Sequence, residues 1–360
     1  MKNNFCIIMA GGVGSRFWPF STGKKPKQFL DFLGTGRTLL QMTFDRFSRV
    51  VPVKNIYISS NQKYKDLILE QLPMLKEEQV LLEPARRNTA PCIAYAVNKI
   101  KSVDENANIV VSPSDHLILK EDEFIDKINQ GFEFTSNHNC LLTLGIKPSR
   151  PETGYGYIQI GEKSQFCDCL FKVKTFTEKP NLELAEIFLE SGEFYWNSGM
   201  FLWNVGAITE AFDLHLPEMA EKFKQGQDHY NTPQEQDFIN QIYASCTNIS
   251  IDYGILEKAQ NVYVLTADFG WSDLGTWRSL YELSDKDAQN NVSLKCRSLL
   301  YESKDNIIVL PEGKLAVVQG VEDLIITETE NVLLICKKSE EQRIRQFVND
   351  VKVKIGEEYV

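Results

Sequence analysis

Residues 5–17 read FCIIMAGGVGSRF, an apolar run that leads directly into a glycine-rich loop. The run Phe5–Met9 is typical of a buried strand. Glycines let the backbone approach a phosphate, and they let successive N–H groups point inward as an anion nest. The alternative for the loop is an ordinary tight turn between a strand and a helix. The stretch therefore predicts a buried strand followed by a candidate phosphate-binding loop.

Similar apolar runs alternate with amphipathic segments along the first 145 residues. Further strands are predicted at Asn55–Ser59, Gln79–Leu82, Asn108–Val111 and Cys140–Leu144. Helices are predicted at Thr38–Val50, Gln62–Leu72, Thr89–Val103 and Asp122–Phe134. This alternation predicts an α/β fold with a Rossmann-like, doubly wound and mostly parallel sheet. In such a sheet, ligands bind beyond the C-terminal ends of the strands.

The pattern of predicted strands and helices changes twice after this region. From Gly154 strands and helices are mixed, and the last predicted helix of this part is Leu274–Leu283. Beyond about Asp285, three short β runs are separated by Pro-Glu-Gly, Gln-Gly and Glu-Asn turns. We therefore expect a large domain at residues 1–285 and a small β-rich domain at residues 286–360.

Charge and cysteine usage exclude several classes of protein. The formal net charge is −10 and the isoelectric point is near 5.1, which argues against nucleic-acid or membrane-surface partners. No apolar stretch approaches the roughly 20 residues of a membrane span. The eight cysteines include no Cys-x-x-Cys pair, and Cys167 and Cys169 form the only close pair. Without a nearby histidine this pair does not predict a zinc site, so we expect reduced thiols in a cytoplasmic protein.

Spacing rules out two common phosphate-binding motifs for the loop. A dinucleotide fingerprint requires a third glycine where Phe17 stands. A Walker A loop fails because Gly23-Lys24 is followed by lysine. The loop instead carries Arg16, and the following KKPKQF adds Lys24, Lys25 and Lys27. Four cations near a glycine nest suit a triphosphate, whereas the alternative is a solvated run of charge.

Further motifs follow the loop in a characteristic order. They are AGGVGSRFWPFS, KPKQF, EPARRNTAP at 83–91, PSDH at 113–116, GYGYI at 154–158, FTEKP at 176–180, WNSGMF at 196–201, SIDYGILEK at 250–258 and FGWSDLGTW at 269–277. Together they resemble the sugar-phosphate nucleotidyltransferases, and specifically their mannose-1-phosphate guanylyltransferase branch. Thr177 departs from the valine that is common in relatives. The resemblance spans residues 5–285, and the β-rich tail is similar to the left-handed β-helix of the family.

This resemblance implies transfer of GMP from GTP to α-D-mannose 1-phosphate, with Mg²⁺ as the cofactor. It also implies a homodimer. The attacking sugar phosphate is already anionic, so the protein must supply positioning, cations and a metal rather than a general base. The resemblance assigns these roles to Arg16, Lys25, Asp115 and Asp273, and the two aspartates would hold the metal. Taken alone, either aspartate could instead belong to a turn or cap a helix.

The resemblance also implies a set of nucleotide contacts. They are Ala10, Gly11, Gly12, Gly14, Ser15, Glu83, Asn88, Thr89 and Ser114. A carboxylate at Glu83 could accept both adjacent donors of guanine. The alternative for Asn88 or Thr89 is a cap on the helix that follows.

A hexose phosphate requires polar groups at fixed angles, and the motifs between positions 154 and 197 supply them. The candidates are Tyr155, Gly156, Glu178, Lys179 and Asn197, with Lys179 as a point charge for the phosphate. We expect Tyr157 and the tryptophans Trp196, Trp203, Trp271 and Trp277 to pack in the core.

Two other functions remain open at this point. The same chemistry could act on another sugar, such as a heptose phosphate or glucose 1-phosphate. A regulatory homologue could bind a nucleotide-sugar without turnover, but such a protein would not need to retain the candidate metal ligands. A dehydrogenase is disfavoured by the missing third glycine.

Overall fold

A computed structural model describes residues 3–360, and the packing of the chain divides it into two compact units. The first unit comprises Met1–Gly11, Thr43–Ser114 and Ile118–Trp271. The second comprises Gly12–Met42, Asp115–Leu117 and Ser272–Val360. Each unit is therefore assembled from stretches that are far apart in the sequence. The expected boundary between residues 285 and 286 stays a prediction.

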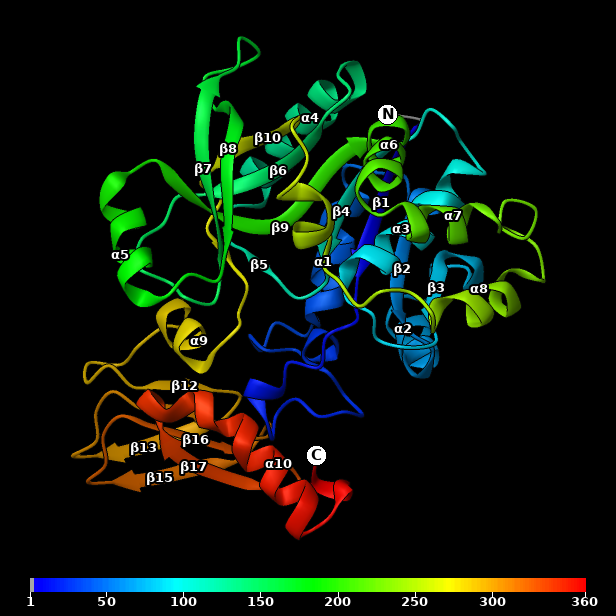
Figure 1. Cartoon of the computed structure of the whole chain (residues 1–360). Coiled ribbons are helices and arrows are strands. Elements are labelled where there is room, and N and C mark those ends of the chain that lie inside the picture. Colours follow the sequence, from blue (N-terminus) through cyan, green and yellow to red (C-terminus); the bar gives the residue numbers. More distant parts are fainter. Residues whose placement is uncertain (1–2) are drawn as a thin grey trace. The chain divides into compact units, whose positions relative to one another are not determined.

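A nine-stranded mixed sheet forms the centre of the first unit, in the order β3-β2-β1-β4-β9-β6-β10-β8-β7 (Figure 1). The strands are β1 (Asn4–Met9), β2 (Ile56–Asn61), β3 (Val80–Glu83), β4 (Asn108–Pro113), β6 (Leu141–Ile146), β7 (Gly156–Lys163), β8 (Leu170–Glu178), β9 (Phe194–Asn204) and β10 (Val262–Ala267). The four strands β3, β2, β1 and β4 run parallel, as their apolar runs predict. Strand β9 is antiparallel to both of its neighbours β4 and β6, which makes the sheet mixed.

Helices of the first unit pack on this sheet or on one another through apolar faces. They are α2 (Lys65–Gln71), α3 (Thr89–Lys101), α4 (Glu121–Asn137), α5 (Leu182–Ser191), α6 (Val205–His215), α7 (Pro217–Lys224) and α8 (Glu235–Tyr243). Helix α3 is buried along most of its length and packs against β1, α6 and α7. The first unit also contains the π-helical turn Asp252–Leu256. Helix α1 (Leu39–Ser48) begins in the second unit and continues into the first at Thr43. Two short strands, β5 (Leu117–Ile118) and β11 (Trp271–Ser272), lie where the chain changes unit.

The second unit contains six short strands and two helices. They are β12 (Val292–Leu294), β13 (Arg297–Tyr301), β14 (Ile307–Val309), β15 (Leu315–Gln319), β16 (Leu324–Glu328), β17 (Leu333–Lys337), α9 (Trp277–Leu283) and α10 (Ile344–Lys354). The strands β12, β14 and β16 pair in parallel, as do β13 and β15. Such stacking of successive chain turns confirms the expected β-helix-like domain. Figure 1 shows α10 beside this stack, where Ile344 joins the apolar cluster that contains Ile325 of β16 and Leu334 of β17.

The N-terminal loop Gly12–Met42 belongs to the core of this second unit. The ring of Phe17 packs against Trp277 at 5.2 Å between ring centres, and both side chains are fully buried. The indole N–H of Trp277 donates to the carbonyl oxygen of Arg16 over 2.9 Å. The indole N–H of Trp18 donates to the carbonyl oxygen of Tyr359 over 2.7 Å. These contacts fix the glycine-rich loop against the C-terminal part of the chain.

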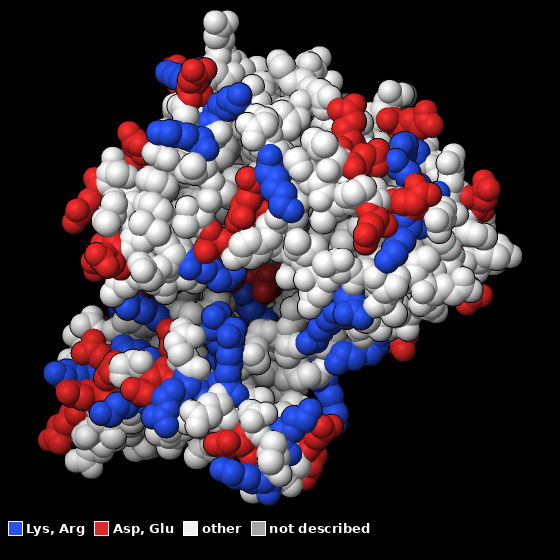
Figure 2. All heavy atoms as spheres, in the orientation of Figure 1, with Lys and Arg blue, Asp and Glu red and all other residues white. Residues whose placement is uncertain are grey.

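The predicted α/β class with a β-rich C-terminal domain is confirmed, and two details differ. The C-terminal region has six strands where three β runs were expected. Helix α9 begins at Trp277 rather than Leu274, because Thr276 caps it by accepting from the Ser279 N–H over 3.1 Å. Within residues 3–360, none of the helices combines the length and apolar character needed to cross a membrane. Figure 2 shows acidic and basic side chains interspersed on the face drawn.

Candidate active site

Three charged residues that are far apart in sequence meet in the second unit. The Nζ atom of Lys27 lies 2.9 Å from Oδ2 of Asp115. The same Nζ donates to the carbonyl oxygen of Asp273 over 2.6 Å. The side chain of Lys27 is only 4% exposed, and that of Asp115 is 28% exposed. The structure thus brings both predicted metal-ligand residues to one ammonium group.

The glycine-rich loop is shaped around Lys27. Gly14 has a φ of +70°, and a Cβ placed there would lie 2.5 Å from Cβ of Lys27. Its left-handed conformation and this close approach both require glycine. The Lys27 N–H donates to the carbonyl oxygen of Val13 over 3.2 Å, and the side-chain amide of Gln28 donates to that of Gly12 over 3.0 Å. Because a Cβ at Gly12 would meet no atom within 4 Å, its backbone is open to a ligand.

Lys25, the lysine predicted to be catalytic, is exposed, and its main chain forms hydrogen bonds with Thr22. The structure places Lys27 beside Asp115 instead. Within the run KKPKQF, Lys27 and the two residues that follow it, Gln28 and Phe29, are buried. Spacing alone does not show which lysine points inward.

Arg16 is half-buried and its guanidinium contacts two residues of the second unit. It donates to the carbonyl oxygen of Gly275 over 3.3 Å and to the side-chain oxygen of Gln342 over 3.2 Å. The other residues expected to be catalytic in this unit include Asp115 and Asp273. Ser15 lies in the 3-10 turn Ser15–Phe17, whose first residue accepts from the Trp18 N–H.

The side chain of Asp273 does not cap a helix. Its Oδ1 accepts from the N–H of Gly275 over 2.8 Å, whereas Thr276 caps α9. Burial raises the pKa of Asp115, but the charges of Lys27 and His116 and the bond from Lys27 outweigh burial and lower it below its ordinary value. Asp115 therefore carries a negative charge at neutral pH.

The donors at this position fit a magnesium ion. Asp115 meets Lys27 through its carboxylate and Asp273 meets it through its main-chain carbonyl. The carboxylates of both residues are the kind of hard oxygen ligand that Mg²⁺ prefers. Within residues 3–360, no group of three or more His, Cys, Asp and Glu side chains is placed to hold a metal. Two carboxylates suit Mg²⁺, which is commonly bound by one or two of them together with water and substrate phosphates.

Glu83 ends strand β3 in the first unit, and protein side chains donate to its carboxylate. Its Oε1 accepts from the Ser59 hydroxyl over 2.9 Å, and its Oε2 accepts from the Tyr243 hydroxyl over 2.6 Å. Burial raises the pKa of Glu83, although hydrogen bonds from Tyr243, Ser59 and Cys92 partly oppose this shift. Any base contact must therefore use the remaining lone pairs of the same oxygens.

The other candidate nucleotide residues of this unit lie at strand and helix ends. Asn88 caps α3 by accepting from the N–H of Thr89 over 3.0 Å, so the capping alternative holds for Asn88. The hydroxyl of Thr89 accepts from the Ile251 N–H. Ala10 follows β1 and Ser114 follows β4, and both are buried. At Gly11, a Cβ would meet no atom within 4 Å.

The candidate sugar residues converge at the paired ends of β7, β8 and β9. Gly156 is the register partner of Glu178, and a Cβ at Gly156 would collide with the Glu178 carboxylate. Lys179 forms an ion pair with Glu178. The Asn197 amide N–H donates to Asp252 over 2.8 Å, and its oxygen accepts from the Thr143 hydroxyl over 3.0 Å.

Aromatic side chains flank this group. The ring of Tyr155 meets those of Trp196 and Trp271 edge-on, with 5.2 Å between ring centres in each pair. Tyr157 is fully buried, as its packing role predicts. Trp196, Trp203 and Trp277 are also buried, whereas Trp271 is half-buried.

Asp252 is a residue of this group that the sequence did not single out, although it lies within the quoted SIDYGILEK. Burial, together with the charge of Glu178, raises the pKa of Asp252 to about 6. The available signal was an aspartate that follows Ile251 and precedes the run Tyr253–Leu256. Its contact with Asn197 depends on packing between β9 and the turn Asp252–Leu256.

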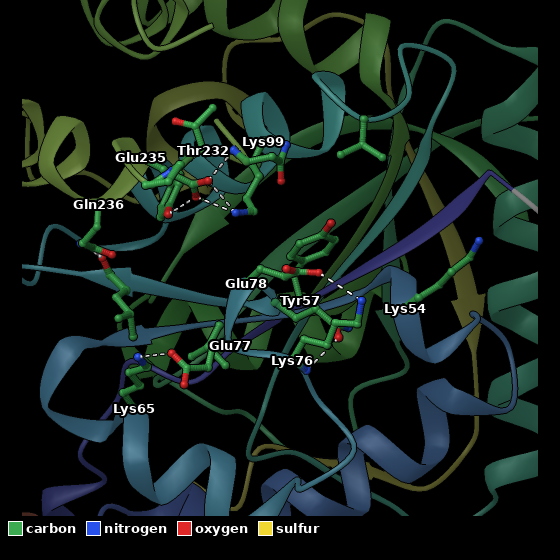
Figure 3. Close-up of a pocket in the computed structure, with 17 residues that line it drawn as sticks. Lys54, Tyr57, Lys65, Lys76, Glu77, Glu78, Lys99, Thr232, Glu235 and Gln236 are labelled. Carbon is green, nitrogen blue, oxygen red and sulfur yellow. Dashed lines mark hydrogen bonds and ion pairs between the residues drawn. The ribbon is translucent and has the colours of Figure 1, made fainter. Parts of the chain in front are cut away.

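A separate pocket of about 740 Å³ lies in the first unit (Figure 3). Figure 3 shows Lys99 of α3 pointing toward Glu235 of α8 on one side. Both side chains are buried, and Nζ of Lys99 lies 2.6 Å from Oε2 of Glu235. None of the predicted site residues lines this pocket.

Comparisons with known proteins agree along most of the chain. The family described as Nucleotidyl transferase matches residues 5–290, and the MannoseP isomerase/GMP-like beta-helix domain matches residues 297–351. The chain is 36% identical over 351 residues to the mannose-1-phosphate guanylyltransferase of Escherichia coli, covering 95% of this chain and 74% of that protein. It is also 36% identical over 363 residues to the enzyme of the same name from Salmonella montevideo, covering 98% and 75% of the two chains.

A solved structure is similar as well. The crystal structure of mannose-1-phosphate geranyltransferase from Thermus thermophilus matches with a TM-score of 0.86 at 28% identity. The match covers 98% of this chain and 100% of that one.

Proposed function

Because the chain belongs to the nucleotidyl transferase family, we propose that it transfers GMP from GTP to α-D-mannose 1-phosphate. The products are GDP-mannose and diphosphate. The name shared by the relatives from Escherichia coli and Salmonella montevideo supports this choice of nucleotide and sugar. The observation that carries the proposal is the meeting of Lys27, Asp115 and Asp273 beside the glycine-rich loop.

The reaction exchanges one phosphoanhydride for another. An oxygen of the sugar phosphate bonds to the α-phosphorus of GTP, while the bond from that phosphorus to the bridging oxygen of the β-phosphate breaks. The attacking oxygen is already anionic, so no side chain has to remove a proton from it. The protein must instead hold the two phosphates together and offset their negative charge.

The second unit supplies the groups suited to this charge. Asp115 and Asp273 would hold Mg²⁺, which when bound offsets the negative charge of the phosphates. Lys27 and Arg16 provide fixed positive charge, and the N–H groups at Gly12 and Gly14 can donate to phosphate oxygens. Lys25 is exposed and could add a flexible contact to the diphosphate.

The first unit supplies polar groups suited to the sugar and the base. Glu178 and Asn197 can bond sugar hydroxyls, and Lys179 can hold a phosphate as a point charge. The absence of a side chain at Gly156 lets the carboxylate of Glu178 lie directly against the main chain of β7. For the base, Glu83 is the acceptor that would distinguish guanine from adenine.

A panel of four nucleoside triphosphates against several sugar 1-phosphates tests the proposal, with diphosphate release as the measurement. We expect GTP with mannose 1-phosphate to give the highest kcat/KM. The Asp115→Asn protein, purified in the same way, controls for contaminating transferases. A preference for a heptose or glucose phosphate would overturn the sugar assignment. Nucleotide-sugar binding with no turnover for any pair would indicate a regulatory homologue instead.

A further inference from the structure

Two cysteine side chains touch at the turn between β7 and β8. The sulfur atoms of Cys167 and Cys169 lie 2.7 Å apart. A disulfide bond is about 2.05 Å long, so a small movement would bring the two sulfurs to bonding distance. Within residues 3–360, this is the one pair of cysteine sulfurs in contact. None of the residues assigned to nucleotidyl transfer takes part.

A cation from another element reaches this pair. The Nζ atom of Lys127, in α4, donates to the sulfur of Cys169 over 3.2 Å. The side-chain oxygen of Gln130 lies 3.8 Å from the same sulfur. A nearby ammonium stabilises the negative charge that a cysteine sulfur carries when it acts as a nucleophile. The two sulfurs are therefore placed unequally, and Cys169 is the one beside the cation.

The turn keeps the pair in place and within reach of solvent. The Ser164 N–H donates to the carbonyl oxygen of Leu170 over 2.8 Å, and the Leu170 N–H donates to that of Cys167 over 3.3 Å. Both cysteines are half-buried, and the side chain of Asp168 between them is 98% exposed. A small oxidant can therefore approach this turn.

We propose that Cys167 and Cys169 are a thiol oxidation site, at which hydrogen peroxide forms a reversible disulfide within the turn. The Cys169 thiolate attacks one peroxide oxygen, an S–O bond forms, the O–O bond breaks, and hydroxide leaves as water after taking a proton. The Cys167 sulfur then attacks the Cys169 sulfur, the S–S bond forms, and the S–O bond breaks. The second hydroxide takes the Cys167 proton. Two thiols and one peroxide thus give one disulfide and two waters, and the sulfurs lose two electrons to the peroxide.

The other cysteines lack this arrangement. Cys6, Cys92, Cys140 and Cys246 are buried, and burial raises the pKa of each thiol. Cys296 and Cys336 are half-buried, but burial raises the pKa of each, and in the part of the chain that the structure describes neither sulfur contacts another cysteine. Burial and the bond with Cys169 also raise the pKa of the Cys167 thiol, which suits the second, resolving role. We therefore expect oxidation to be selective for the turn.

The test uses the reduced full-length protein and one equivalent of hydrogen peroxide. Remaining thiols are then blocked with N-ethylmaleimide under denaturing conditions, and the digested protein is analysed by mass spectrometry. Trypsin should release residues 164–172, SQFCDCLFK, which contain both cysteines. We expect this peptide to be two hydrogens lighter and unlabelled, and dithiothreitol to restore both labels. Two labels on this peptide, with thiols lost elsewhere or not at all, would overturn the proposal, as would disulfide-linked dimers.

Variants distinguish the proposed roles. Cys167→Ser should leave Cys169 as a sulfenic acid that reacts with dimedone. Lys127→Gln should slow oxidation by roughly tenfold, because thiolate character controls reactivity, whereas Lys127→Arg should keep the rate. Lys120→Gln, which removes an exposed lysine just before α4, is the matched control and should have no effect. Equal rates for Lys127→Gln and the unmodified protein would refute the role of the cation.

Discussion

Lys27 donates from Nζ to Oδ2 of Asp115 over 2.9 Å, across 88 positions of sequence. The same ammonium donates to the main chain at Asp273. A single positive charge thus joins the loop after β1 to two carboxylate residues from distant segments. Since an ammonium in this position can also reach a phosphate oxygen, Lys27 is the lysine that we expect to matter most for catalysis.

The first prediction compares Lys27→Met with Lys25→Met. Removing a fixed donor that stabilises developing charge should lower kcat by about 10²–10³-fold. Loss of the exposed Lys25 should cost less than about tenfold, because an exposed cation acts through solvent. Both rates are measured by diphosphate release, with circular dichroism as the check on folding. A larger loss of kcat in Lys25→Met than in Lys27→Met would show that Lys25 is the catalytic lysine.

The second prediction concerns the base and Glu83. Glu83→Gln replaces an acceptor by an amide, so a guanine donor would lose its partner at a cost of about 1–3 kcal/mol. We expect the ratio of kcat/KM for GTP over ATP to fall by roughly 5- to 150-fold.

Tyr243→Phe is the matched control for Glu83. It removes the 2.6 Å bond to Oε2 but keeps the carboxylate. Thermal stability should fall, whereas the GTP/ATP ratio should stay constant. If the ratio is unchanged in Glu83→Gln as well, Glu83 serves only to hold Ser59 and Tyr243.

The third prediction follows from the raised pKa of Asp252. The folded value of about 6 lies above the ordinary value for aspartate, so the folded protein binds this proton more tightly than the unfolded chain. Stability from this group is therefore present below about pH 4 and is lost as the pH rises toward the folded pKa. Asp252→Asn removes this dependence.

Urea unfolding between pH 4 and pH 7 measures the effect of Asp252. We expect the free energy of unfolding of the Asp252→Asn protein to increase relative to that of the unmodified protein as the pH rises. The relative increase should be on the order of 1–3 kcal/mol at pH 7. Asp228→Asn, which removes an exposed carboxylate, serves as the control for the loss of one negative charge. A difference that shrinks with rising pH would contradict the raised pKa.

The fourth prediction contrasts two ion pairs of equal length. Lys99 and Glu235 are buried at 2.6 Å, and Lys224 and Asp213 are exposed at the same distance. Lys99→Met leaves a buried carboxylate without its cation, which should cost about 3–5 kcal/mol. Lys224→Met should cost less than about 1 kcal/mol, because water screens the exposed pair. The midpoints of urea unfolding measure both costs. Equal losses of stability in the two variants would show that burial does not determine how much these ion pairs contribute.

The main elements of the fold were predictable because local patterns encode them. Uninterrupted apolar runs such as Phe5–Met9 mark strands that are buried on both faces, and the glycine-rich loop follows the first of them. The identity of the inward lysine was not predictable, because Lys25 and Lys27 are both lysines of one short run and differ only in their packing. The place of Asp252 in the candidate site was not predictable for the same reason. Its burial is produced by β9 and the turn Asp252–Leu256, which are far apart in sequence.

The last prediction is that Asp115 and Asp273 act on one magnesium ion. Both lie at the Lys27 ammonium, and together they offer the oxygen donors that Mg²⁺ prefers. Asp115→Asn and Asp273→Asn should each lower kcat by orders of magnitude while the fold survives, because asparagine preserves the shape. Activity without added metal should be near zero, since two carboxylates alone would repel the phosphates.

The double variant decides whether the ion is shared. Removing either ligand already disables a shared ion, so Asp115→Asn combined with Asp273→Asn should be little worse than either single change. Magnesium affinity, measured by titration in the presence of GTP, should fall in both single variants. Full activity in excess chelator would reject the metal role. If the losses of kcat are strictly additive and the two single variants differ in metal affinity, the two aspartates have different roles. Asp273 would then serve mainly to fix the turn at Gly275.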